Sequence, residues 1–67
     1  MNAKALRAAM YIADYTIGRL AKEMGTRGYT LGQKISGKRE FKLSEVVKLC
    51  ELLNIKNHEQ IIKIFFS

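Results

Sequence analysis

Lysine and arginine are the chemically active side chains that this 67-residue sequence concentrates in one place. The segment 19–42 holds seven of these cations against two glutamates, a net charge of +5, while the whole chain carries +6. The seven are Arg19, Lys22, Arg27, Lys34, Lys38, Arg39 and Lys42. Such a cluster is the electrostatic footprint of a protein that binds a phosphate backbone. A solvated basic surface is the plainer alternative, and composition alone leaves both open.

The other reactive residue types are too few or too scattered to build a catalytic or metal site. A single cysteine excludes an internal disulfide, and with a single histidine it cannot supply a Cys/His metal cluster. Cys50 falls in an apolar stripe, as a small core residue would, and no pair of carboxylates is accompanied by a nucleophile or a ligand. We therefore expect no enzyme, no cofactor and no small-molecule substrate.

Helices are the elements that must position the basic segment. Hydrophobic residues make up 48% of the chain, there is no proline, and the apolar residues recur at helical spacings. A chain of this length holds one small domain. The pattern predicts an all-α fold of five short helices, at about 3–13, 17–24, 28–36, 44–53 and 58–65.

Capping residues and apolar stripes support these helices. Asn2, Thr16 and Asn57 stand where N-caps are expected, and Gly25 and Gly37 stand where a left-handed residue ends a helix. The inward faces of the helices, together with Phe41 from the loop before the fourth helix, are expected to form the core. The inward positions are Leu6, Ala9, Met10, Ala13, Ile17, Leu20, Ala21, Met24, Leu31, Ile35, Val46, Val47, Leu49, Cys50 and Leu53.

The stretch "LAKEMGTRGYTLGQKISGKRE" (20–40) carries a specific spacing of small and apolar residues. Ala21 allows close approach between helices, Gly25 makes a tight turn, and Leu31 anchors the next helix. This combination resembles the helix-turn-helix of Cro- and C1-type phage repressors, with a likeness that runs from about Leu6 to Ile55. The segment "KISGKREFKLSEVVKLCELLNI" is similar to small Cro/repressor proteins from phages of Gram-positive bacteria. The resemblance implies a lambda-repressor-like fold with the helix-turn-helix at helices 2 and 3.

The resemblance also implies a function, a sequence-specific transcriptional regulator that binds double-stranded operator DNA. The third helix would lie in the major groove, with base contacts at Gly28, Tyr29, Gly32 and Gln33. Expected phosphate contacts are Thr16, Ile17, Arg19, Arg27, Thr30, Lys34, Lys38, Arg39 and Lys42. Gln33 can make two hydrogen bonds with adenine, whereas Tyr29 can contact DNA or simply cover the turn.

Two glycines in the third helix leave part of the expected reading face bare. Each glycine inside a helix costs about 1 kcal/mol relative to alanine. Gly28 and Gly32 can let the helix backbone approach the groove closely, or they can weaken a helix that reads sequence poorly. The second possibility favours a different function, a protein-interaction module such as an antirepressor or modulator that binds a partner repressor.

The tail "QIIKIFFS" is more apolar than one short terminal helix usually needs. We expect Ile61, Ile64, Phe65 and Phe66 to form a homodimer interface at least on DNA, although these residues can instead complete the core. Isoleucine and phenylalanine also suit a strand, so the sequence leaves helix or strand open for this tail. No apolar stretch reaches the roughly 20 residues of a membrane span, and the expected location is the cytoplasm of a bacterial host.

Overall fold

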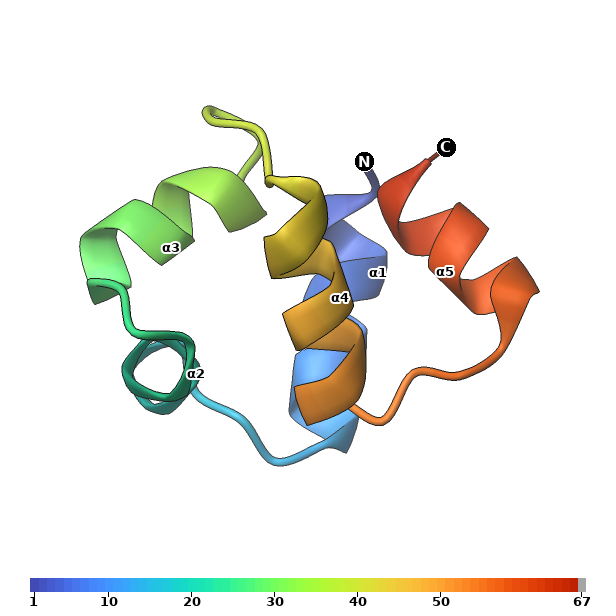
Figure 1. Ribbon diagram of the computed structural model, residues 1–67, viewed down its shortest axis with the longest axis horizontal. Coiled ribbons are helices and arrows are strands. Elements are labelled where there is room, and N and C mark those ends of the chain that lie inside the picture. The colour runs from blue at the N-terminus through green and yellow to red at the C-terminus, as the bar shows by residue number, and fades with distance from the viewer. Residues whose placement is uncertain (67) are drawn as a thin grey trace.

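Five short helices follow one another along the chain, and the computed structural model describes residues 1–66. The helices are α1 (Ala3–Ile12), α2 (Ile17–Met24), α3 (Gly28–Ile35), α4 (Leu43–Leu52) and α5 (His58–Phe65), as Figure 1 shows. Residues 1–66 contain no strand, so the predicted all-α fold is confirmed and the tail is helical as far as Phe65. Predicted boundaries are off by one residue in α1, α3 and α4. None of the helices in this range is long and apolar enough to cross a membrane.

Side-chain caps start three of the helices where they were predicted. The Asn2 side chain accepts a hydrogen bond from Ala5 N–H, and Thr16 Oγ1 accepts one from Arg19 N–H. The Asn57 side chain accepts from the N–H groups at the start of α5. These bonds satisfy backbone donors that have no partner within the helix.

Helices α1 to α4 all end in the same way, with one residue in the left-handed conformation. The φ angles are +60° at Asp14, +71° at Gly25, +89° at Gly37 and +57° at Asn54. The N–H of the next residue then bonds back to the carbonyl five positions earlier, for example Tyr15 to Met10 at 2.9 Å and Lys38 to Gln33 at 2.9 Å. This is the Schellman motif, which satisfies the last carbonyls of a helix.

The core receives side chains from all five helices. Its buried members are Leu6, Ala9, Met10, Leu20, Ala21, Leu31, Ile35, Leu49, Leu53, Ile55 and Ile64. Phe41 packs against this core, as predicted, and meets the Phe65 ring edge to face at 6.2 Å. The prediction of an inward position is wrong for two residues, because Ile17 is 39% exposed and Val47 is 54% exposed.

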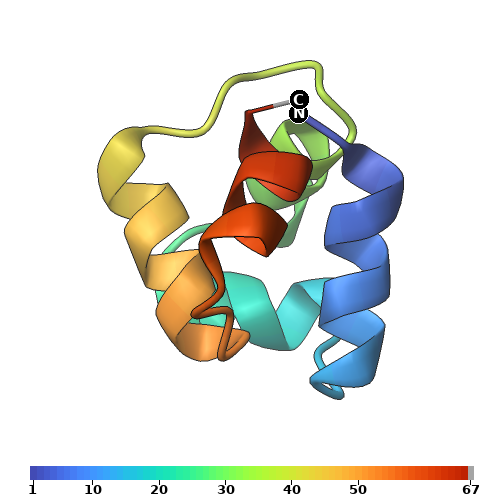
Figure 2. The same ribbon diagram turned by 90° about the vertical axis from the view of Figure 1, so that its right-hand side faces the viewer.

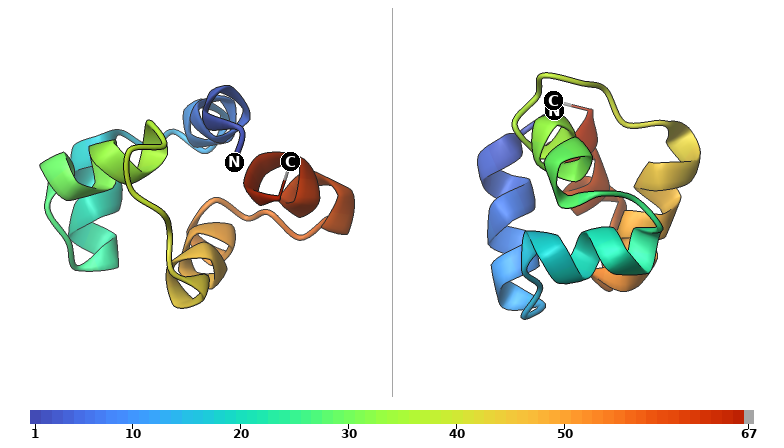
Figure 3. Two further views of the ribbon diagram at one scale, coloured as in Figure 1. Left: turned by 90° about the horizontal axis from the view of Figure 1, so that it is seen from above. Right: turned by 90° about the vertical axis from the view of Figure 1, so that its left-hand side faces the viewer.

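Helix α5 closes one side of the molecule. Figure 2 shows it in front, between α4 and α1, with its end beside the N-terminus. Asn2 N–H donates to the Ile64 carbonyl at 2.7 Å, which ties the two ends of the chain together. Helices α2 and α3 lie on the other side (Figure 3, right), whereas the loop that follows α3 reaches α5, where Arg39 and Phe41 share a hollow with Phe65.

Candidate nucleic-acid interface

Helix α3 is held by one face and exposed on the other. Leu31 and Ile35 are fully buried, and α3 packs mainly against α2, to which residues 25–27 connect it. In Figure 1, α2 is seen nearly end-on while α3 runs across the view, so the two axes cross steeply. The steep crossing leaves the outer face of α3 at the edge of the molecule, where a partner can reach it.

The outer face of α3 presents Tyr29 and Gln33, one helical turn apart. Tyr29 is 76% exposed, and Gln33 is half-buried. Gln33 Nε2 donates a hydrogen bond to the Tyr29 hydroxyl oxygen at 2.8 Å. The spacing of four residues, which brings side chains together on a helix, was the only sequence signal for this contact. Helix α3 has no acidic residue, so its exposed face offers neutral polar groups.

The two glycines of α3 lie in different surroundings. A Cβ added to Gly28 would lie 4.0 Å from Ile17 Cγ2, which is ordinary contact, so Gly28 faces the first turn of α2. A Cβ added to Gly32 would meet nothing within 4 Å. Neither residue has the positive φ that requires glycine. The fold therefore does not need glycine at Gly32, and the bare backbone there is open to an external partner.

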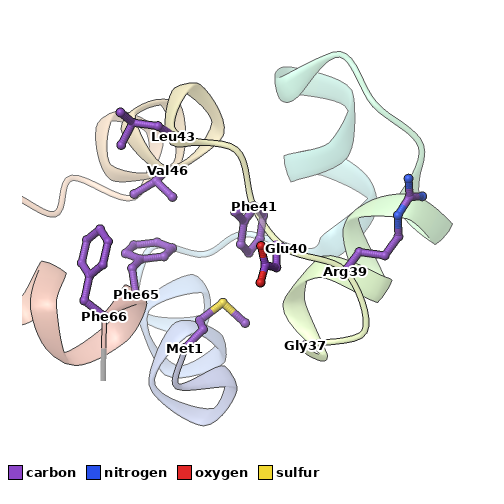
Figure 4. Close-up of a pocket in the computed structure, with 9 residues that line it drawn as sticks. All are labelled: Met1, Gly37, Arg39, Glu40, Phe41, Leu43, Val46, Phe65 and Phe66. Carbon is purple, nitrogen blue, oxygen red and sulfur yellow. The ribbon is translucent and has the colours of Figure 1, made fainter.

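Five of the seven cations in segment 19–42 form no ion pair within the described chain. Lys22 and Arg27 precede α3, and Lys38, Arg39 and Lys42 follow it, and all five are exposed. Figure 4 shows the Arg39 side chain extending away from the apolar residues around it. The unpaired cations thus flank both ends of α3 in the chain, whereas its outer face is uncharged.

Lys34, a predicted phosphate ligand, has a different role. Its side chain is only 12% exposed, and its Nζ bonds to Glu45 Oε2 of α4 at 2.6 Å. Burial opposes ionisation of Glu45, but hydrogen bonds from Lys34 Nζ and the Lys42 N–H outweigh it and lower the pKa of Glu45. Lys34 therefore links α3 to α4, and its Nζ is engaged by Glu45 rather than free for a phosphate.

Arg19 is also engaged, although it stays on the surface. Its guanidinium lies 4.2 Å from the centre of the Tyr15 ring, donates to the Asp14 carbonyl at 3.0 Å, and pairs with Glu23 at 3.3 Å. The Tyr15 hydroxyl donates to Glu23 at 2.7 Å, and this bond together with Arg19 lowers the pKa of Glu23. These contacts hold Arg19 beside the first turn of α2.

The starts of α3 and α4 lack the side-chain caps that α1, α2 and α5 possess. Arg27 and Lys42 occupy the N-cap positions and make no side-chain cap bond, as expected for side chains that carry no acceptor. Glu45 accepts from Lys42 N–H at 2.7 Å, so α4 keeps one compensating bond. In α3 the first N–H groups, including that of Thr30, have no side-chain acceptor, and a cation stands beside the positive end of the dipole.

An apolar groove lies between α4 and α5, and Gly37, Arg39 and Glu40 of the loop after α3 line one end of it. Leu43 and Val46 form one wall and Phe65 and Phe66 the other, with Met1 at the base, and the groove encloses about 530 Å³ (Figure 4). A second hollow of about 410 Å³ shares Leu43, Val46 and Phe66 with the first.

The four predicted dimer residues differ in how much of each side chain is exposed. Phe66 is 65% exposed, and Ile61 and Phe65 are half-buried. Ile64 is 1% exposed and belongs to the core, so the prediction that it lies in the dimer interface is wrong. Its neighbour Ile62, which the sequence did not single out for the interface, is exposed. Helical phase explains the exchange, because α5 turns Ile64 into the core and leaves Ile62 exposed.

Cys50 is half-buried beside the core, and burial raises the pKa of its thiol. A raised pKa lowers the fraction of reactive thiolate.

Comparison with known proteins found no matching family model, no matching curated protein and no matching solved structure.

Proposed function

We propose that this protein is a sequence-specific regulator of transcription, of the helix-turn-helix class, that binds double-stranded DNA through α3. The observation that carries the proposal is the arrangement around α3. An exposed helix face without acidic residues is flanked in the chain by five cations that form no ion pair within the described residues.

The proposed docking follows from the neutral outer face of α3 and from the cations at its two ends. A major groove about 12 Å wide admits one α-helix, and the outer face of α3 is exposed at Tyr29 and bare at Gly32. Cations at both ends of the helix can reach the phosphates on either side of the groove. Lys38 and Arg39 follow α3 directly and are the leading phosphate ligands, while Tyr29 and Gln33 face the bases.

The free N–H groups at the starts of α2 and α3 can add to the phosphate contacts. Ile17 Cγ2 of α2 approaches the Gly28 position of α3, so the first turns of the two helices lie close together. Two helix N-termini in one region favour an anion, and Thr16 and Arg27 mark these ends. A phosphate bound there would accept hydrogen bonds from the backbone N–H groups that no side chain caps at the start of α3.

A salt titration of duplex binding tests the proposal. Log K should fall linearly with log salt for the wild-type protein, and Lys38→Ala should make the slope shallower by about 0.9, the value for one phosphate contact. The matched control is Lys56→Ala, which removes the same charge from the exposed loop between α4 and α5. Equal effects of the two substitutions would show that binding is diffuse, and the proposal would then fail.

A second copy of the chain is the proposed partner of the apolar groove. Leu43, Val47 and Phe66 are exposed around the groove and the hollow beside it, Ile62 is exposed on α5, and a two-fold interface uses the same patch on both copies. Pairing would place two α3 helices on one duplex, as two half-sites require. We expect Phe66→Asp to reduce the cooperativity of DNA binding and the dimer fraction in sedimentation. A wild-type protein that stays monomeric on DNA would contradict this pairing and leave the groove to a different protein partner.

A further inference from the structure

We propose that Tyr29 is a positioning residue that sets which edge of the Gln33 amide faces the DNA bases, and that this setting selects adenine. The inference rests on the proposed function of α3 and adds a specificity to it. It starts from one observed contact, the bond that Gln33 Nε2 donates to the Tyr29 hydroxyl at 2.8 Å.

A free glutamine amide is ambiguous in what it offers a base. It carries two N–H donors on Nε2 and an acceptor oxygen, and rotation by half a turn exchanges the two ends. One orientation offers a donor and an acceptor together, and another offers mainly donors. A glutamine without a neighbour to fix it therefore discriminates weakly between purines.

The bond to Tyr29 removes this ambiguity in α3. The hydroxyl oxygen accepts one N–H of Gln33, which leaves the second N–H and Oε1 available to an external partner. Adenine presents an acceptor at N7 and a donor at N6 in the major groove, which matches this remaining pair. Guanine presents two acceptors there, N7 and O6, and it matches only a group with two donors.

The surroundings of the pair favour a steady geometry. Gln33 is half-buried, its carbonyl accepts from Ser36 Oγ at 3.0 Å, and it also accepts from Lys38 N–H at 2.9 Å in the turn that ends α3. No side chain at Gly32 competes for the amide. Gln33 therefore has a fixed backbone and, within α3, a neighbour at the spacing of one turn that can hold its amide.

Selection from a duplex pool with a randomised core, followed by affinity measurements on single-base variants of the selected site, tests the inference. Gln33→Ala identifies the base pair that Gln33 reads, because the wild-type preference is lost there. At that pair we expect adenine in the wild-type site. Tyr29→Phe should reduce the ratio of affinities for adenine and guanine by about fivefold, the size of one exposed hydrogen bond.

The melting temperature of Tyr29→Phe should stay close to wild type, since the ring remains. Tyr11→Phe, which removes a hydroxyl from another highly exposed tyrosine, is the matched control and should change neither ratio nor affinity. Guanine at the Gln33-dependent pair, or an unchanged base ratio in Tyr29→Phe, would overturn the role of Tyr29 and leave DNA binding intact. A wild-type protein that enriches no sequence would overturn the proposed function, and this inference with it.

Discussion

Helices α2 and α3 have the same length, eight residues, and are each anchored by a fully buried leucine, yet they are stabilised very differently. Helix α2 has the Thr16 cap and an ion pair between its own residues Arg19 and Glu23. Helix α3 has no side-chain N-cap, contains two glycines, and forms an ion pair only to another helix. Helix α3 therefore lacks two local sources of stability that α2 has, and functional surfaces of proteins commonly depart from such local rules.

The largest expected effect concerns the ion pairs of the two helices. Replacing Glu45 with glutamine leaves the part-buried Lys34 without its counter-charge, and we expect a loss of about 1–2 kcal/mol in the free energy of unfolding. The matched change Glu23→Gln removes an exposed pair within one helix turn and should cost less. Urea unfolding at neutral pH measures both, and an equal cost would contradict the structural role of Lys34.

The same pair predicts a pH dependence. The folded pKa of Glu45 lies below its usual value, so its stabilisation is complete above the unfolded pKa of about 4.3. The stabilisation disappears as the pH falls through the folded value. The difference in stability between wild type and Glu45→Gln should therefore shrink below about pH 4. A constant difference from pH 7 to pH 3 would argue against ionisation of Glu45 as its source.

Exchanging the caps tests the contrast between the two helix starts. Thr16→Ala should cost α2 about 1 kcal/mol, whereas Arg27→Ser should stabilise the fold by a similar amount, because it supplies α3 with an acceptor. Arg27→Ser should also weaken duplex binding, since a cation is lost. The decisive result is that Arg27→Ser raises the free energy of unfolding and lowers the affinity for duplex DNA. Lower stability of Arg27→Ser, or tighter binding to duplex DNA, would contradict this contrast between the two helix starts.

The smallest effect is expected at Gly32, where an added methyl group meets nothing within 4 Å. Gly32→Ala should stabilise the fold by about 0.5–1 kcal/mol, and Gly18→Ala in α2, also free of contacts, is the matched control. If the bare backbone serves close approach, Gly32→Ala alone weakens duplex binding. Unchanged or tighter binding would show that the glycine only weakens the helix.

Local signals account for the parts of the fold that the sequence predicted. Asn2, Thr16, Asn57, Gly25 and Gly37 act within a few residues of their own positions, so their types announce their roles. The left-handed Asp14 and Asn54 were not predicted, although short polar side chains tolerate that conformation.

Features that depend on packing between helices were not predictable. Lys34 and Glu45 are eleven residues apart on different helices, and no sequence pattern joins them. Ile64 and Ile62 differ in exposure only because of the direction in which α5 faces the core. Lys38 and Arg39 remain exposed as expected, but their role as phosphate ligands stays a prediction.

Backbone amide NMR during titration with duplex DNA tests the central claim most directly, because it observes the two surfaces of the molecule at once. We predict the largest shift changes at the starts of α2 and α3, along the outer face of α3 and at Lys38 and Arg39, with smaller changes at the α4–α5 groove from self-association. Changes confined to the α4–α5 groove, or no changes at low salt, would contradict the assignment of α3 as the DNA-binding surface.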